Sequence, residues 1–393
     1  MKSLGKPARQ LLKLCENRAA FQRVLTFNSA MQRCSSHTSP PCTSSSPIDF
    51  EAIKAEMLAR PVQIHTDSMY ATNSRLLTTA LADFLPEECL FELKTPKTSV
   101  YLGDTAFVPP GHHLVYFPLE LRGSQLCPDG TDPYHSPRGT PFTRRMWAGG
   151  SIQGFEGLTL DGRGGVCVER IEDVKVHGPT GSEKIYVEVL RIYLKQDILT
   201  QWQKRASSEF DLPRDLSEHG LDGMTERRTL VFMRELSDEN KLMSMEKKQK
   251  VIKAPSRPKY SVTLRPTPTL LFHYSALSYN AHRIHLDSSY CREVEGYQDL
   301  LVHGPLSLTL MLSVLKSSLT GSGYDINKID YRHIAPLYVD QTMHVCCAPR
   351  ASKCTEKQNG TTGRNKWDVW VENQDGGLCV KGTVETMKIS NDA

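Results

Sequence analysis

A strongly apolar stretch begins after Gly304 and Pro305. Glycine admits backbone geometries closed to other residues, and proline suits the first position of a helix, where its missing N–H costs nothing. The apolar positions that follow are Leu306, Leu308, Leu310, Met311, Leu312, Val314, Leu315 and Leu319. Because they cover nearly all sides of a helix, they predict a buried helix that ends at residues 321–323.

Four segments with strand-like composition follow this helix. Each carries β-branched or aromatic residues in partial alternation with polar ones, which is typical of strands. They cover residues 326–339, 342–348, 366–373 and 378–389. One buried helix followed by four antiparallel strands predicts a sheet wrapped round a central helix.

The first half of the chain also carries strand patterns. Residues 185–193 alternate as a strand should, and Gly-Pro-Thr-Gly at 178–181 predicts a turn before them. Residues 226–233 are a further strand candidate. The charged, Lys-rich stretch 235–259 that follows is interpreted as a linker or an exposed helix.

Length and composition set the class of protein. A chain of 393 residues predicts two or three domains. Its 39% hydrophobic and 23% charged residues are typical of a globular protein, and no apolar run approaches the ~20 residues of a transmembrane helix. The net charge of +4 is mild, so no nucleic-acid binding is expected of the folded part.

Much of the positive charge lies in the first 45 residues. Their basic residues are Lys2, Lys6, Arg9, Lys13, Arg18, Arg23 and Arg33, against the single acid Glu16. Apolar residues are interleaved with them, as in a mitochondrial transit peptide, and the Ser/Thr/Pro-rich run 35–47 reads as a flexible junction. We therefore expect residues 1–47 to direct the chain to the mitochondrial matrix; the alternative is a disordered basic tail.

Neither a metal nor a cofactor is expected. The eleven cysteines are scattered without a CxxC pair, which favours reduced thiols over a disulfide framework or a zinc site. His282 and His285 have the spacing of one helical face, but no well-spaced third ligand completes a site. No Gly-rich phosphate loop follows a strand.

The stretch 275–306 carries the candidate chemistry. It holds His282, His285, His303, Asn280 and Asp287 just before the helix that starts at Gly304. An imidazole can move protons near neutrality because its ordinary pKa is about 6.5. The start of a helix can hold the negative charge that builds on a carbonyl oxygen, which is what a thioester enzyme requires.

The same stretch resembles the MaoC-like hydratase and dehydratase family, which has the hotdog fold. Residues 280–285, Asn-Ala-His-Arg-Ile-His, stand at the family signature, and His303-Gly304-Pro305-Leu306 stands at the helix start. Residues 274–287, 294–306 and 144–150 are similar to motifs of the two-hotdog branch. That branch contains fungal mitochondrial 3-hydroxyacyl-thioester dehydratases and mesaconyl-C4-CoA hydratase-like proteins.

The resemblance implies an α+β double hotdog, two antiparallel sheets each wrapped round a central helix. We expect residues 48–234 to form a non-catalytic N-terminal hotdog, 235–264 a charged linker and 265–393 the catalytic hotdog. Arg144, Arg145 and Trp147 are expected to lack a partner acid or base of the signature type, because the first hotdog has no equivalent of the His-Arg-Ile-His motif. The first hotdog would replace the second subunit of a single-hotdog enzyme, so that the molecule is a monomer or a homodimer.

The resemblance also implies roles for individual residues. His285 matches the catalytic histidine, and the Gly304 N–H is the expected oxyanion donor, which can contribute about 3 kcal/mol to lowering the barrier. Asn280 stands where the family has a catalytic Asp, so an orienting role is expected, with loop capping as the alternative. Either His285 acts alone or Asp287 assists it.

The remaining candidates each have two interpretations. Arg283 could contact a phosphate of coenzyme A or of a carrier protein's phosphopantetheine, or form a salt bridge with Asp287. His303 is either a catalyst or a helix-entry residue bonded to the backbone. His282 is expected to line the pocket or to be structural.

The function expected from the resemblance is reversible dehydration of (3R)-3-hydroxyacyl thioesters to trans-2-enoyl thioesters. The basic N-terminal segment favours acyl-carrier-protein substrates in mitochondrial type II fatty-acid synthesis, with coenzyme A thioesters as the other carrier. One alternative is hydration of a short branched or dicarboxylic enoyl-CoA. Another is a non-catalytic hotdog that binds acyl chains.

Overall fold

The computed structural model describes residues 48–91, 107–203, 223–246, 251–350 and 365–389. The chain divides into two units, residues 1–48 and 49–393, and every element below belongs to the second. The expected targeting segment and junction, residues 1–47, lie outside the described residues.

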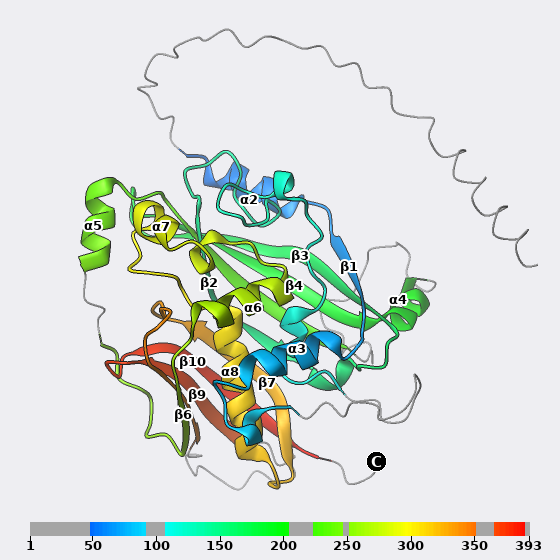
Figure 1. Ribbon diagram of the computed structural model, residues 1–393. Helices are drawn as coiled ribbons and strands as arrows, with labels where there is room; N and C mark the ends of the chain where they lie inside the picture. The colour runs from blue at the N-terminus through cyan, green and yellow to red at the C-terminus, as the bar shows by residue number, and fades with distance from the viewer. Residues whose placement is uncertain (1–47, 92–106, 204–222, 247–250, 351–364, 390–393) are drawn as a thin grey trace, which may run out of the picture. The chain divides into compact units, whose positions relative to one another are not determined.

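Ten strands form one continuous antiparallel sheet (Figure 1). Their order across the sheet is β1-β3-β4-β5-β2-β7-β10-β9-β8-β6. The strands are β1 (Gln63–Ser68), β2 (Arg144–Gln153), β3 (Gly164–His177), β4 (Lys184–Lys195), β5 (Met224–Met233), β6 (Tyr260–Leu264), β7 (Tyr324–His333), β8 (Met343–Pro349), β9 (Asn365–Asn373) and β10 (Leu378–Lys388). The strand candidates of both halves are confirmed, with shifted ends.

The strand order repeats within this sheet. From each outer edge to the middle, the strands run β1-β3-β4-β5-β2 in the first repeat (residues 49–233) and β6-β8-β9-β10-β7 in the second repeat (residues 260–388). In both, a helix follows the outer strand: α3 (Thr72–Leu81) after β1 and α6 (Pro268–Ser278) after β6. The sheet is therefore a double hotdog of the α+β class, as the sequence predicts.

The two repeats join edge to edge through β2 and β7. Gly149 pairs with Arg332 across this junction, and a Cβ on Gly149 would lie 2.4 Å from the Tyr331 carbonyl oxygen of β7. Only glycine lets the backbones approach so closely. The joined sheet is consequently a single hydrogen-bonded layer rather than two separate ones.

The other helices are short, apart from one. They are α2 (Phe50–Leu58), α4 (Gln196–Gln203), α5 (Asp238–Glu246), α7 (Ser288–Tyr290) and α8 (Gly304–Leu319). The 3-10 turns are η2 (Glu87–Cys89), η3 (His112–Val115), η4 (Gly123–Gln125), η5 (Phe155–Gly157) and η7 (Arg283–His285), and η8 (Cys291–Glu295) is a π-helical turn. None of the helices in the described ranges combines the length and apolar character needed to cross a bilayer.

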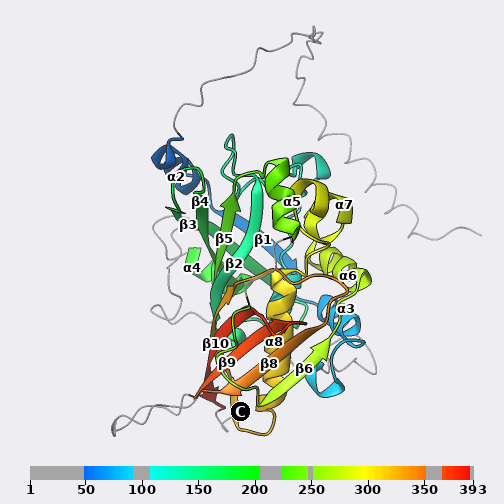
Figure 2. The same cartoon turned by 90° about the vertical axis from the view of Figure 1, so that its left-hand side faces the viewer.

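Helix α8 is the predicted central helix, and it is buried almost throughout its length. Strands β6 to β9 contact it, and Figure 2 shows the sheet of the second repeat curving past it. Each fully buried leucine of such a helix contributes about 1.5–3 kcal/mol to folding. The helix thereby fixes the position of its own first residue, Gly304.

The first repeat differs from the expectation that each sheet surrounds its own helix. Between α3 and β2, the residues that the structure describes form no long helix, and Gly111, just before η3, lies against α8. A Cβ at Gly111 would lie 3.0 Å from Thr309 Cα, and the Thr309 hydroxyl donates to the Gly111 carbonyl at 3.3 Å. One central helix therefore serves the apolar side chains of both repeats.

The segment expected as a linker, 235–264, is partly ordered structure. It contains α5 and ends in β6, which pairs with β8. The second repeat thus begins within the residues assigned to that linker.

Candidate functional site

A cavity of about 540 Å³ lies between the two repeats. From the second repeat it is lined by α6, the loop after it and the start of α8, and from the first repeat by strand residues and the chain around 114–135. His285, Asn280, His282 and Gly304 are among the lining residues. The structure therefore brings the main sequence candidates into one crevice.

The loop that carries these candidates is set by the end of α6. Tyr279 closes the helix in the left-handed region, with φ of 52°, which turns the chain away from the helix axis. The Asn280 N–H donates to the Ser275 carbonyl at 2.9 Å, and the Asn280 side-chain oxygen accepts from the His282 N–H at 3.0 Å. Asn280 thus caps the loop through its oxygen while it also lines the cavity.

His285 is a neutral base in this arrangement. Its Nδ1 lies 2.8 Å from the Leu301 carbonyl oxygen, which can only accept, so Nδ1 carries the hydrogen and Nε2 keeps its lone pair. Burial lowers the pKa of His285 to about 4, although the bond to Leu301 opposes this shift. The imidazole therefore stays unprotonated at neutral pH.

The three histidines of the sequence motif are in mutual contact. The rings of His285 and His303 stack with centroids 3.7 Å apart, and His282 meets His285 edge to face at 5.6 Å. His303 is fully buried, with Nε2 2.9 Å from the Ser275 hydroxyl, and it is not among the residues lining the cavity. Burial, together with the neighbouring imidazoles, keeps the pKa of His282 and of His303 well below the usual range.

Gly304 opens α8 at the wall of the cavity. Its amide belongs to the first turn of the helix, whose N–H groups have no intrahelical acceptor. A Cβ there would lie 3.2 Å from His333 Nε2 and 3.3 Å from Trp147 Cβ. Glycine at this position keeps the helix start open to the cavity.

Arg283 and Asp287 are not among the residues lining the cavity. They form an ion pair of 2.7 Å on the surface, and the guanidinium lies over the Tyr290 ring at 4.3 Å. Asp287 also accepts the Tyr290 N–H at 3.0 Å and so begins α7. Of the two interpretations of this pair, the contacts match the salt bridge.

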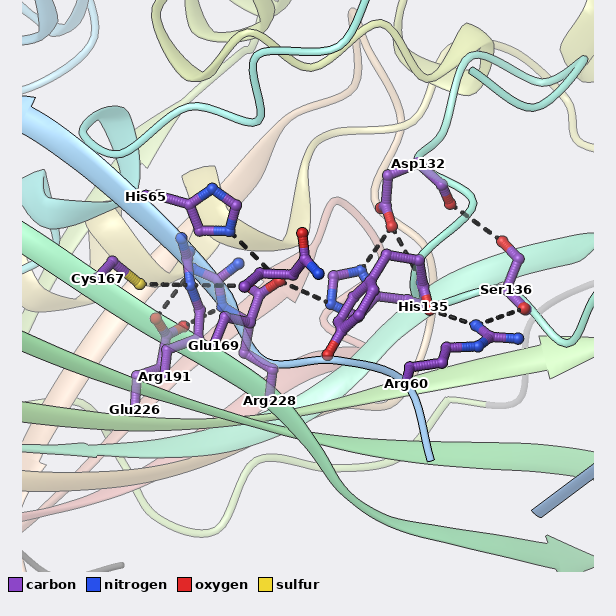
Figure 3. A network of polar contacts seen from close by, with 12 residues as sticks. Arg60, His65, Asp132, His135, Ser136, Cys167, Glu169, Arg191, Glu226 and Arg228 are labelled. Atoms are coloured by element: carbon purple, nitrogen blue, oxygen red, sulfur yellow. Dashed lines mark hydrogen bonds and ion pairs between the residues drawn. The ribbon is translucent and has the colours of Figure 1, made fainter. Parts of the chain in front are cut away.

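Sequence reasoning missed a network of charged side chains on the first repeat (Figure 3). Asp132 lies 2.6 Å from Arg145 and 2.8 Å from His135, and His135 lies 3.1 Å from Glu169. The ion pairs Arg191–Glu169 (2.9 Å) and Arg228–Glu226 (2.6 Å) extend it along β3, β4 and β5. The members that line the cavity are Asp132, His135, Arg145, Glu169, Arg191 and Arg228.

Within this network, neighbouring groups of opposite charge shift the pKa values of Asp132 and His135 toward their charged forms. Burial would raise the pKa of Asp132, but Arg145 and His135 outweigh it and lower that pKa well below the usual range. Burial would lower the pKa of His135, but Asp132 and Glu169 raise it. Asp132 is therefore a firmly ionised carboxylate and not a proton donor.

Arg144, Arg145 and Trp147 of the first repeat make polar contacts that the sequence did not predict. Arg144 lies 2.8 Å from Glu295 of the second repeat, and Arg145 pairs with Asp132. The Trp147 indole N–H donates to the Tyr331 hydroxyl at 3.0 Å. The one sequence signal was the presence of charged residues on the apolar faces of strands, such as Arg191 in the alternation of 185–193.

No group of three or more His, Cys, Asp or Glu side chains is placed to hold a metal ion, as far as the described parts of the chain go. The histidines of the motif are instead engaged with Leu301 O, Ser275 and one another.

Comparison with known proteins identifies the family. The sequence profile described as hydroxyacyl-thioester dehydratase type 2 matches residues 111–339, which is more than half of the chain. The chain belongs to this family. The resemblance drawn from the motifs is thereby confirmed.

Curated relatives of this dehydratase-family chain align with about two thirds of it. The mitochondrial hydroxyacyl-thioester dehydratase type 2 of Schizosaccharomyces pombe is 30% identical over 281 residues, 68% of this chain and 88% of the relative. Mesaconyl-C(4)-CoA hydratase of Chloroflexus aurantiacus is 28% identical over 278 residues, 67% of this chain and 83% of the relative. Both relatives are named as hydro-lyases, and the first is named as mitochondrial.

A solved structure supports the fold. The MaoC-like dehydratase of Phytophthora capsici matches with a TM-score of 0.52 at 15% identity, over 86% of this chain and 99% of that chain. Together with the repeated strand order, this likeness confirms the double hotdog.

The buried neutral histidines make folding sensitive to acid. The pKa is lowered to about 4 in His285 and His333 and to about 3 in His112. Below pH 6.5 the unfolded chain takes up protons at these positions before the folded chain does. The free energy of unfolding should therefore fall between pH 6.5 and about 4, by up to about 1.4 kcal/mol per pH unit for each such histidine.

Urea unfolding at pH 7.5, 6.0 and 5.0 measures this slope. The His285→Gln variant should show a shallower slope, and His135, whose pKa is raised, contributes in the opposite direction. An unfolding free energy that stayed constant from pH 7.5 to 5.0 would contradict the prediction.

Proposed function

We propose that the chain catalyses reversible dehydration of (3R)-3-hydroxyacyl thioesters to trans-2-enoyl thioesters. The observation that carries the proposal is that His285, with a free Nε2 lone pair, and the helix start at Gly304 line one cavity. A base and an oxyanion donor in one crevice are what proton abstraction next to a thioester carbonyl requires.

The reaction runs on these groups as follows. Nε2 of His285 takes a proton from the carbon next to the carbonyl, and the electron pair moves onto the carbonyl oxygen, where the Gly304 N–H donates to it. The enolate then reforms the carbonyl and expels the hydroxyl from the next carbon. That hydroxyl takes the proton from His285 and leaves as water, which creates the double bond.

Asn280 takes an orienting role in this scheme. Its side-chain oxygen is used by the His282 N–H at 3.0 Å, so its NH2 group is the part that can hold the substrate hydroxyl or the water. An amide cannot exchange protons as an acid would. The proton shuttle therefore falls to His285 alone, because Asp287 is paired with Arg283 at the surface.

We assign the chain to the mitochondrial matrix and to acyl-carrier-protein substrates, with coenzyme A thioesters as the other carrier. The mitochondrial relative and the basic segment 1–45 support this assignment. A fusion of residues 1–45 to a fluorescent reporter should accumulate in the matrix. A reporter that stayed in the cytosol would remove the assignment.

The pairing of β2 with β7 supports a monomer that is a pseudo-dimer of hotdogs. The contact that two subunits of a single-hotdog enzyme would make is supplied here within one chain. A non-catalytic acyl-binding role is disfavoured because the base and the helix start are both intact in the cavity.

A second candidate function, hydration of a short dicarboxylic or branched enoyl-CoA, has one observation in its favour. The first repeat lines the cavity with the guanidinium groups of Arg191 and Arg228, which suit a substrate carboxylate better than an apolar tail, and each is also ion-paired with a glutamate of its own repeat. The relative named mesaconyl-C(4)-CoA hydratase agrees with it.

Replacement of His285 tests the primary proposal. The His285→Gln variant keeps the size and polarity of the side chain but removes the base, so crotonyl-CoA hydration should fall about 10²–10⁴-fold. His344→Gln is the matched control, since His344 bonds Thr263 on the outer strands and is not among the lining residues. Undiminished turnover by His285→Gln would refute the role of His285.

Substrate comparison separates the two candidate functions. The primary proposal expects a higher kcat/KM for hexadecenoyl than for mesaconyl thioesters. The opposite order would favour the second candidate. In that case Arg228→Met should reduce the turnover of mesaconyl but not of crotonyl thioesters, because only the mesaconyl group carries a free carboxylate. The same acyl group on carrier protein and on coenzyme A identifies the preferred carrier.

A further inference from the structure

One polar side chain of the cavity has no role in the scheme above. His333 ends β7, next to the junction with the first repeat, and lines the cavity together with Gly304. The sequence motif of residues 280–304 does not include it, because it lies some thirty residues further along the chain. Only the folding of β7 against the start of α8 brings it to the site.

The nitrogen of His333 that faces the helix start lacks a partner. Among the described residues, Nε2 has no hydrogen-bond partner, although it is buried. The remainder of the side chain keeps some exposed surface, consistent with its place in the cavity wall. A buried polar atom without a partner costs stability, so a ligand that supplies the partner regains it.

The position of this nitrogen points to the substrate carbonyl. Nε2 lies 3.2 Å from where a Cβ of Gly304 would be, so a side chain at position 304 would crowd the imidazole ring. A carbonyl oxygen that accepts from the Gly304 N–H would come to the same edge of the imidazole ring. A carbonyl oxygen has two lone pairs and can accept from both groups at once.

Neighbouring aromatic groups fix the ring. Tyr331 meets His333 edge to face, with centroids 5.9 Å apart, and its hydroxyl accepts the Trp147 indole N–H at 3.0 Å. On the other side of the strand, Val380 of β10 pairs with His333 in register. Tyr331 therefore limits the positions of the imidazole on one side, and an oxyanion donor acts best when it is positioned before the substrate arrives.

We propose that His333 is a further catalytic residue, whose Nε2–H donates to the thioester carbonyl oxygen as the second member of an oxyanion hole with the Gly304 N–H. The proposal rests on the proposed function. It divides the work between two histidines: His285 moves the proton, and His333 remains neutral and stabilises the enolate oxygen. Burial alone lowers the pKa of His333 to about 4, which keeps the ring uncharged at neutral pH.

Two variants of His333 test this role. His333→Leu keeps approximate volume without a donor, and kcat for hydration of crotonyl thioester should fall about 10²–10³-fold, as for loss of one oxyanion donor. KM should change less than kcat. His333→Gln places an amide N–H near the former Nε2 and should retain more of the activity, and His344→Leu on β8 serves as the control of the same residue type.

A spectroscopic measurement reads the proposed contact directly. The carbonyl stretch of a bound enoyl thioester, labelled with ¹³C at the carbonyl carbon, should lie lower on the wild-type protein than in water. On His333→Leu it should move back toward the free value. If the Leu variant does not fold, His333→Asn, whose amide is too short to reach the Nε2 position, replaces it in both measurements.

The outcomes are distinguishable. If the wild-type protein turns over the substrate and His333→Leu has the same kcat and the same carbonyl frequency as wild type, the role of His333 is overturned. The proposed function would then still stand. Absence of turnover and of carbonyl polarisation in the wild-type protein would overturn both.

Discussion

The unpaired amides at the start of α8 are the constraint on which the rest of this site depends. A buried helix start must find acceptors for its N–H groups, and here the helix opens onto a cavity rather than onto protein atoms. The apolar length of α8 holds that opening in place, and Gly304 keeps it free of a side chain. The imidazoles of His285 and His333 then lie on the wall of the same cavity.

The two repeats contribute different groups to the site around that helix. The second repeat supplies α8 and the histidine motif, whereas the first supplies a wall of paired charges and lacks a long helix of its own in its described residues. Gly111, just before η3, contacts Thr309 of α8, and apolar residues of both repeats join one core cluster with this helix. The cost of burying Asp132, Glu169 and Glu226 is offset by a basic partner for each.

Local pattern was enough to predict much of this arrangement. The all-round apolar run from Leu306 predicts α8, and alternation predicts the later strands, because both signals depend on neighbours in sequence. The role of His285 as the base was implied by the resemblance of its motif to the MaoC-like family, and the motif could be recognised because its residues are close along the chain. The ring contacts among His282, His285 and His303 became apparent only in the structure, although the three residues lie in one stretch of sequence.

Contacts between distant segments were beyond local pattern. Nothing near Arg145 in sequence indicates that Asp132 pairs with it across a turn, or that Glu295 pairs with Arg144 from 151 positions away. His333 looks like an ordinary strand residue until β7 is placed beside α8. In its described residues the first repeat holds no long helix between α3 and β2, and its apolar side chains join the core cluster around α8, which local pattern does not indicate.

The closed middle of the sheet has a consequence for association. Since β2 and β7 are each paired on both sides, the described strands leave open hydrogen-bonding rims only at β1 and β6, the far ends of the layer. β6 has five residues and β1 has six, so each edge provides few backbone groups with which a strand of another molecule could pair. With both hotdogs in one polypeptide, the long edges of β2 and β7 stay paired with each other. Separate subunits would expose these edges whenever they dissociated.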